Sequence, residues 1–257
     1  MLYPDVESIV RIISNIAAMD ETMGARRRCL MNALAKLIAA DGWEWRVAVR
    51  ANGDPRPTSV NHMHGGLNDS QIAGLIEQSL LPHEDQSPEC EAIWREVQKG
   101  DHFTFTRRQL VDDDDWYPHP TVKRLRIERG LDDFVYSCQP CNSIAVSATV
   151  FLRVTDAEPF TERERELVHL VMSNVDWMHH AIVPQTHDCR VSEMTPRQRV
   201  VLDFLLQGYS RLEIGEALNI SPHTANDHIK RIYKHFKVNS HIGLIRHFSC
   251  GDAPVSN

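Results

Sequence analysis

Apolar and polar residues in the first 160 positions follow two periodicities. Apolar residues spaced three and four apart indicate helices with one buried face, and alternating or continuous apolar runs indicate strands. The helical segments are residues 6–19, 25–39, 69–81, 89–98 and 122–129. The extended segments are residues 45–50, 102–106, 133–137 and 143–154. This order predicts an antiparallel sheet flanked by helices.

A longer helical pattern follows in residues 159–182, PFTERERELVHLVMSNVDWMHHAI. Thr161 and Glu164 fit a capping box at its start. The apolar stripe down this helix consists of Leu167, Leu170, Val171, Val175, Met178 and Ile182. Two interpretations have equal weight. Either the helix forms a dimer contact or carries a signal toward the C-terminus, or its stripe covers the sheet.

From position 195 onward the pattern changes to short helices with clear start signals. Capping residues precede each start: Thr195 with Gln198, Ser210 with Glu213, and Ser221 with Pro222. The apolar residues of the first two helices are Val201, Leu202, Leu205, Ile214, Ala217 and Leu218. Gly208 is placed to end the first helix.

The third of these helices is strongly amphipathic. Its buried stripe is predicted to be Ala225, Ile229, Ile232 and Phe236. Its outward face then carries His223, Asn226, Asp227, Lys230, Arg231 and Lys234. A tight turn, Asn219-Ile220-Ser221, joins it to the helix before. Two short helices with such a turn and long polar side chains on the second predict a helix-turn-helix that reads the major groove of DNA.

Residues 194–248, MTPRQRVVLDFLLQGYSRLEIGEALNISPHTANDHIKRIYKHFKVNSHIGLIRHF, resemble the four-helix DNA-binding domain of LuxR-type regulators, which includes GerE- and NarL-like proteins. The resemblance runs through TPR, the EI-x-x-x-L core, ISPHT, HIKRIYK and the closing V-x-S. It implies that the third helix enters the major groove of double-stranded DNA. The base-side positions would be Asn226, Asp227 and Lys230. The positions nearer the phosphates would be Thr224, His228, Arg231 and Lys234.

The sequence departs from this family pattern at three positions. Ala225 stands where Val is usual, Asn226 where Lys or Arg is usual, and Leu212 where Lys is frequent. Asn can pair with adenine and Asp227 can accept from cytosine, but each missing cation removes a phosphate contact. We therefore expect weak DNA binding by a monomer and a need for homodimers.

The fourth helix, residues 240–248, is where the family usually places its dimer contact. Gly243 occupies the position where Glu would complete a capping box with Ser240. A glycine allows close backbone approach, so Ile242, Gly243 and Ile245 are candidates for a twofold contact. The alternative, with nearly equal weight, is a tolerated change in a weak helix.

The end of the N-terminal region resembles a GAF-type sensor domain. The resemblance rests on paired strands followed by D-x-x-PFTERER and a long helix. The chain is therefore predicted to be α+β, with a GAF- or PAS-like sensor domain over residues 1–182. A linker would follow at 183–193, and an all-α helix-turn-helix domain over residues 194–250.

Charge divides the chain in the same place. The formal net charge is −7, and residues 190–257 contain nine Lys and Arg and six Asp and Glu, which leaves −10 for residues 1–189. No run approaches the roughly 18 apolar residues of a membrane span, and MLYPDVESIV lacks the features of a signal peptide. We expect a cytoplasmic protein with no membrane partner.

Other candidate sites give weaker signals. Cys138 and Cys141 fit a hairpin turn better than a redox pair or half a metal site. His62 with His64, His179 with His180, and the acidic run 112–115 have only slight metal-binding character, the last fitting a solvated loop. No nucleophile, phosphate loop or zinc-protease motif indicates an enzyme or a cofactor. Phosphoacceptor and homoserine-lactone patterns are absent too, which leaves another small molecule open as effector.

These features together predict a DNA-binding transcriptional regulator. Its sensor domain would respond to a small molecule or a partner, and its dimer would bind a twofold operator. The alternative is a protein-interaction module whose LuxR-like tail no longer binds DNA.

Overall fold

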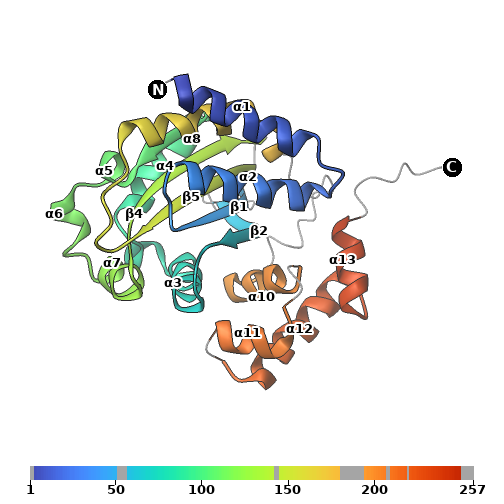
Figure 1. Ribbon diagram of the computed structural model, residues 1–257. Helices are drawn as coiled ribbons and strands as arrows, with labels where there is room; N and C mark the ends of the chain where they lie inside the picture. The colour runs from blue at the N-terminus through green and yellow to red at the C-terminus, as the bar shows by residue number, and fades with distance from the viewer. Residues whose placement is uncertain are drawn as a thin grey trace.

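A five-stranded antiparallel sheet organises the N-terminal part of the chain (Figure 1). The computed structural model describes residues 3–50, 57–141, 145–179, 194–206, 209–218 and 220–249. The strands are β1 (Gly42–Arg50), β2 (Pro57–Gly65), β3 (Phe103–Thr106), β4 (Leu131–Pro140) and β5 (Ala145–Val154). Their order across the sheet is β2-β1-β5-β4-β3. The predicted α+β class with an antiparallel sheet is confirmed.

Helices cover both faces of this sheet. One face is covered by α1 (Tyr3–Ala17), α2 (Met23–Leu37) and α8 (Glu162–Asn174). The other is covered by α3 (Asp69–Leu80), α4 (Glu89–Lys99), α5 (Arg107–Leu110), α6 (Asp113–Trp116) and α7 (Pro120–Leu125). Short 3-10 turns lie at η1 (His83–Asp85), η2 (Ile127–Arg129) and η3 (Asp176–Met178).

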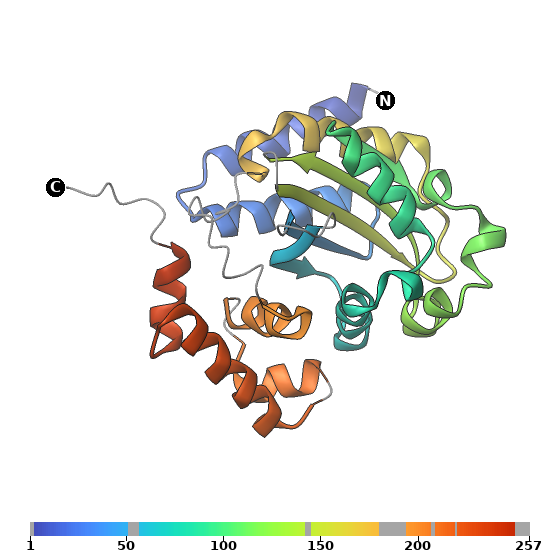
Figure 2. The ribbon, with the colours of Figure 1, turned by 180° about the vertical axis from the view of Figure 1, so that it is seen from behind.

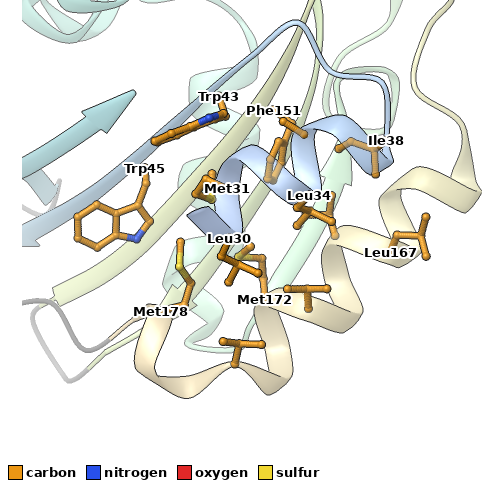
Figure 3. Packing of buried hydrophobic residues seen from close by; sticks show 14 of the residues in the cluster. Leu30, Met31, Leu34, Ile38, Trp43, Trp45, Phe151, Leu167, Met172 and Met178 are labelled. Atoms are coloured by element: carbon orange, nitrogen blue, oxygen red, sulfur yellow. The ribbon is translucent and has the colours of Figure 1, made fainter. Parts of the chain in front are cut away.

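The apolar core between the sheet and the α1, α2 and α8 layer explains why this half of the chain folds. Figure 3 shows Trp43 and Trp45 of β1 on the same side as Met31 of α2 and Phe151 of β5. Alternate residues of β1 supply Trp43, Trp45 and Val47 to this side of the sheet, because successive strand residues point to opposite faces. Burying each large side chain contributes roughly 1.5–3 kcal/mol, so this layer is a major source of stability.

The long helix predicted for residues 159–182 is shorter in the structure. The capping box of Thr161 and Glu164 is confirmed, but α8 ends at Asn174 and Val175 leaves helical geometry. The stripe residues Leu167, Val171 and Met178 are buried in the core beside α2. The stripe therefore covers the sheet, while Ile182 and the predicted linker 183–193 lie outside the described residues.

Two local predictions need correction. The sequence 57–65 is largely polar and predicted only a short strand at HMHGG, yet it forms all of β2 along β1. The acidic run 112–115 was expected to be a solvated loop, but it begins α6. Asp113 there pairs with the fully buried Arg107, which holds the pKa of that carboxyl below its usual range. One of the four carboxylates thus has a structural role.

The C-terminal part is a bundle of four short helices. They are α10 (Pro196–Leu206), α11 (Arg211–Ala217), α12 (Pro222–Phe236) and α13 (His241–Ser249). Thr195 with Gln198 and Ser210 with Glu213 form the reciprocal hydrogen bonds of capping boxes, as predicted. Gly208 and Asn219, which were expected at the helix boundaries, lie outside the described residues.

None of the helices in the described parts of the chain is long and apolar enough to cross a membrane.

A pair of histidines joins α8 to the sheet edge. The rings of His102 and His169 stack with centroids 4.8 Å apart. His102 Nε2 is 2.9 Å from Ser137 Oγ, and His169 Nδ1 is 3.2 Å from Thr104 Oγ1. Burial, and then the neighbouring His169, lower the pKa of His102 to about 4. The folded domain therefore holds this ring in its neutral form at neutral pH.

Acidification should destabilise the N-terminal domain through His102. An unfolded histidine has a pKa of about 6.5, so protons bind the unfolded chain first. The stabilisation present above pH 6.5 is lost as the pH falls toward 4. In urea unfolding followed by tryptophan fluorescence, His102→Gln should flatten the dependence of unfolding free energy on pH across that window. The exposed His223→Gln serves as control, and parallel curves for His102→Gln and the parent would contradict the assignment.

Candidate DNA-binding interface

The local sequence fixes where α12 begins and which side it buries. Ser221 Oγ accepts a hydrogen bond from the Thr224 amide at 3.0 Å, and Pro222 occupies the first turn, where its missing N–H costs nothing. The stripe predicted from helical spacing, Ala225, Ile229, Ile232 and Phe236, is buried in the C-terminal core. The opposite side of α12 is therefore turned outward.

The structure brings all seven predicted DNA-contact residues together on α12. Thr224, Lys230, Arg231 and Lys234 are exposed, and Asn226, Asp227 and His228 are partly buried. Asp227, Lys230 and Lys234 lie near the middle of the outward face, opposite the buried stripe, and Asn226 lies on its flank. A helix that presents amide, carboxylate and ammonium groups along one exposed face has the donors and acceptors needed to read base edges.

Two of these residues have partners that modify their role. His223 Nε2 lies 3.7 Å from Asp227 Oδ2, one helical turn away. Burial, and then the charges of Arg197 and Arg231, lower the pKa of His228 below its usual value. The His228 ring is therefore neutral near pH 7, so it can offer a phosphate a hydrogen bond but little positive charge.

Sequence reasoning missed Arg197 as part of this surface. Its Nη2 donates to the Leu218 carbonyl oxygen at 2.8 Å, which ties the start of α10 to the end of α11. Its charge also reaches His228 on α12. A cation in the first turn of a helix is unfavourable beside the positive end of the helix dipole. Its presence at Arg197 is the sequence signal that this side chain has a partner outside its own helix.

Residues 192–248 match the model described as GerE, bacterial regulatory proteins, luxR family. The C-terminal domain belongs to the luxR family. This confirms the resemblance found in the sequence, and the matched segment contains the whole of α10, α11 and α12 and nearly all of α13.

Three solved structures resemble the chain at low similarity. Escherichia coli SdiA is 15% identical with a TM-score of 0.43, over 94% of this chain and 95% of that chain. SdiA in complex with octanoyl-rac-glycerol is 15% identical with a TM-score of 0.44, over 97% and 96%. The VqsR LBD domain from Pseudomonas aeruginosa is 14% identical with a TM-score of 0.45, over 69% and 94%. No curated protein matches the sequence.

The LuxR-family domain carries more of its exposed cations in or just after α12 than on α11, whose basic residue is Arg211. Leu212, at a position where the family frequently has Lys, is exposed on α11. Lys230, Arg231, Lys234 and Lys237 are all exposed in or just after α12. The positive charge of this surface therefore lies mainly on the second half of α12, in the arrangement that attracts polyanions.

The LuxR-family domain also leaves apolar side chains of α13 uncovered. Ile242 is 64% exposed and Ile245 is 37% exposed. The Gly243 amide donates to Ser240 Oγ at 3.0 Å, so the predicted serine cap is present. A Cβ added at Gly243 would lie 3.3 Å from Ser240 Oγ and 3.5 Å from Val238 Cβ, so it would face the start of its own helix.

The remaining candidate sites show few features of a reactive site. Burial raises the pKa of the Cys138 thiol to about 12 and also raises that of Cys141, the opposite of a reactive redox pair. Both cysteines are free, and Cys138 lies within β4. Across the described ranges, no three His, Cys, Asp or Glu side chains are grouped to hold a metal. His180 lies outside those ranges.

A polar cluster that the sequence did not reveal is buried between α3, α4 and the end of α7. Gln78 Nε2 and Ser87 Oγ both donate to Glu89 Oε1, at 3.0 and 2.8 Å, and Arg126 Nη2 lies 3.9 Å from it. Gln78 Oε1, Glu89 Oε2, and Arg126 Nε and Nη1 have no hydrogen-bond partner among the described residues. Such buried atoms cost about 1–3 kcal/mol each unless water or a ligand satisfies them.

Replacing Lys230 and Lys234 together by Ala should weaken DNA binding without altering the fold, because both side chains point away from the buried stripe. The slope of log affinity against log salt concentration should fall by about 1–2, as phosphate contacts are lost. The control Lys36→Ala/Lys123→Ala removes the same charge from exposed positions of the N-terminal domain. Anisotropy titrations in which both double variants match the parent would refute the recognition-helix assignment.

Proposed function

We propose that this chain is a transcriptional regulator that binds a twofold DNA operator as a homodimer, under the control of its N-terminal sensor domain. The main support for the proposal is that the family match and the exposed polar face fall on the same helix. The segment matched to the luxR family contains α12, and α12 carries all seven potential DNA-contact residues outside its buried stripe. The proposed role is binding rather than catalysis.

Dimerisation is supported by the limited charge of the interface. A monomer offers few cations to the phosphate backbone, since Asn226 and Leu212 replace basic residues and His228 is neutral. Two half-sites bound together would double the number of contacts and supply the affinity that one lacks. The exposed Ile242 and Ile245 of α13, with Gly243 beside them, form the proposed twofold contact.

Sensing is supported by the polar cluster in the N-terminal domain. Gln78, Glu89 and Arg126 hold both donor and acceptor atoms without partners among the described residues. A small polar effector that supplied those hydrogen bonds would bind the folded domain and stabilise it. Native mass spectrometry of the purified chain would reveal such an effector if it co-purifies.

Selection of bound fragments from genomic DNA tests the function directly. The full chain should enrich sites with two related half-sites, and its affinity for them should fall steeply with salt. A chain that enriches no sequence and shows no salt-dependent gel shift would instead be a protein-interaction module with a LuxR-like tail.

Asn226→Ala should change the sequence preference of the chain more than its overall affinity. An amide that makes two hydrogen bonds to adenine contributes about 1–3 kcal/mol of discrimination against other bases. The same selection, repeated with the variant, should return sites relaxed at one position in each half-site. Identical sites for variant and parent would show that Asn226 does not read a base.

Gly243→Glu should impair dimer formation on DNA while it completes the helix cap with Ser240. Half-site binding should stay close to the parent value, and binding to two half-sites should lose its cooperativity. Gly243→Ala is the matched control, because it removes the roughly 1 kcal/mol helix penalty of glycine without adding charge. A Glu variant that binds two half-sites as tightly as the parent would leave Gly243 without a dimer role.

A further inference from the structure

The core of the LuxR-family domain contains two side chains from the N-terminal domain. Ile72 and Ile76 of α3 are buried in the same apolar cluster as Val201, Phe204 and other C-terminal residues, and Leu67 packs against it. α10 contacts β2 and α3, and α11 also contacts α3. Figures 1 and 2 both show α10 between the sensor domain and the rest of the bundle.

α10 is apolar over more of its circumference than one buried face requires. Val201, Leu202, Phe204 and Leu205 are all at most 3% exposed, and Leu206 is partly buried. At 100° per residue these positions cover more than half of the circumference of α10. One side packs against α12, and the remainder faces the sensor domain.

Polar contacts lie beside this apolar contact. Tyr209 Oη is 3.3 Å from His64 Nε2 at the end of β2, and its ring packs on Phe204 with centroids 4.9 Å apart. Burial lowers the pKa of the Arg197 guanidinium, and the charge of Glu77 on α3 offsets part of that shift, so the two side chains interact across the contact. The contact therefore combines apolar burial with directional polar groups, which fixes an orientation as well as a distance.

α3 itself is held firmly in the sensor domain. A Cβ at Gly74 would lie 2.6 Å from the Leu125 carbonyl oxygen, so only glycine allows α3 to approach α7 this closely. Glu77 pairs with Arg124 and, at 3.1 Å, with Arg129. Gln78, the residue after Glu77 and one turn beyond Gly74, belongs to the buried polar cluster. A change in that cluster would thus move the helix on which the LuxR-family domain rests.

We propose that α3 and the end of β2 form a docking surface for α10 through which the sensor domain fixes the orientation of its own LuxR-family domain. The docked arrangement leaves the outward face of α12 and the isoleucines of α13 exposed. Docking therefore does not block DNA. It presents the two recognition helices of a dimer in a fixed relation, which raises the effective concentration of the second helix at its half-site. This inference rests on the proposed dimeric DNA binding.

The test replaces the two shared side chains by neutral polar ones of high helix propensity, Ile72→Gln/Ile76→Gln, in the full chain. The control Met23→Gln/Val154→Gln makes the same kind of change at exposed apolar positions of the sensor domain. Small-angle scattering without DNA reports whether the domains stay docked. Anisotropy titrations use two duplexes from the genomic selection, one carrying a single half-site and one carrying both.

We expect the Ile72→Gln/Ile76→Gln chain to expand in scattering and to bind the single half-site within about twofold of the parent. Its affinity for the double site should fall at least about tenfold. Unchanged scattering would overturn the docking role of these residues. Expansion with unchanged double-site affinity, or with equal loss on both duplexes, would overturn the orienting role. A parent chain that binds neither duplex would refute the proposed function itself, whatever the scattering shows.

Discussion

The burial of four side chains on α12 determines what the C-terminal domain presents to its surroundings. Ala225, Ile229, Ile232 and Phe236 pack into the core formed with α10 and α11. Because they lie on one side of the helix, the long polar residues between them must point outward. The three large side chains contribute roughly 1.5–3 kcal/mol each, far more than any exposed ion pair on the same helix. The position of the outward face of α12 is thus a consequence of packing, while the chemistry of that face is free to vary.

The two faces of the N-terminal sheet differ in a way that fits a sensor. The face toward α1, α2 and α8 is closed by tryptophan, leucine and methionine side chains. The face toward α3 and α4 also has an apolar core, but it holds an ionic and amide cluster whose hydrogen bonds are incomplete within the described residues. The apolar face stabilises the fold. The polar cluster on the other face is a place where a bound molecule that completed its hydrogen bonds would change the stability of the domain.

Local signals in the sequence predicted the C-terminal domain closely, because caps and helical periodicity act over a few residues. The starts at Thr195, Ser210 and Ser221 and the stripe on α12 needed no tertiary information. β2 was largely missed because its residues are mostly polar and its strand form depends on pairing with β1, which its own periodicity does not reveal. The end of α8 at Asn174 was missed because the apolar stripe continues past it, through η3, onto the same core. The neutral state of His228 and the engagement of Arg197 depend on neighbours from other helices, which spacing along the chain does not reveal.

The two-sided apolar surface of α10 has a consequence for how such chains evolve. Regulators of this architecture diversify readily if sensor and DNA-binding modules can be exchanged by recombination. Here Phe204, Leu205 and their neighbours are constrained by two domains at once, so a new sensor must bring a matching α3 with it. A chimera joined at residues 183–193 would combine an α10 with a foreign partner surface. Because Ile72, Ile76 and Phe204 share one apolar cluster, changes at these positions are expected to be coupled.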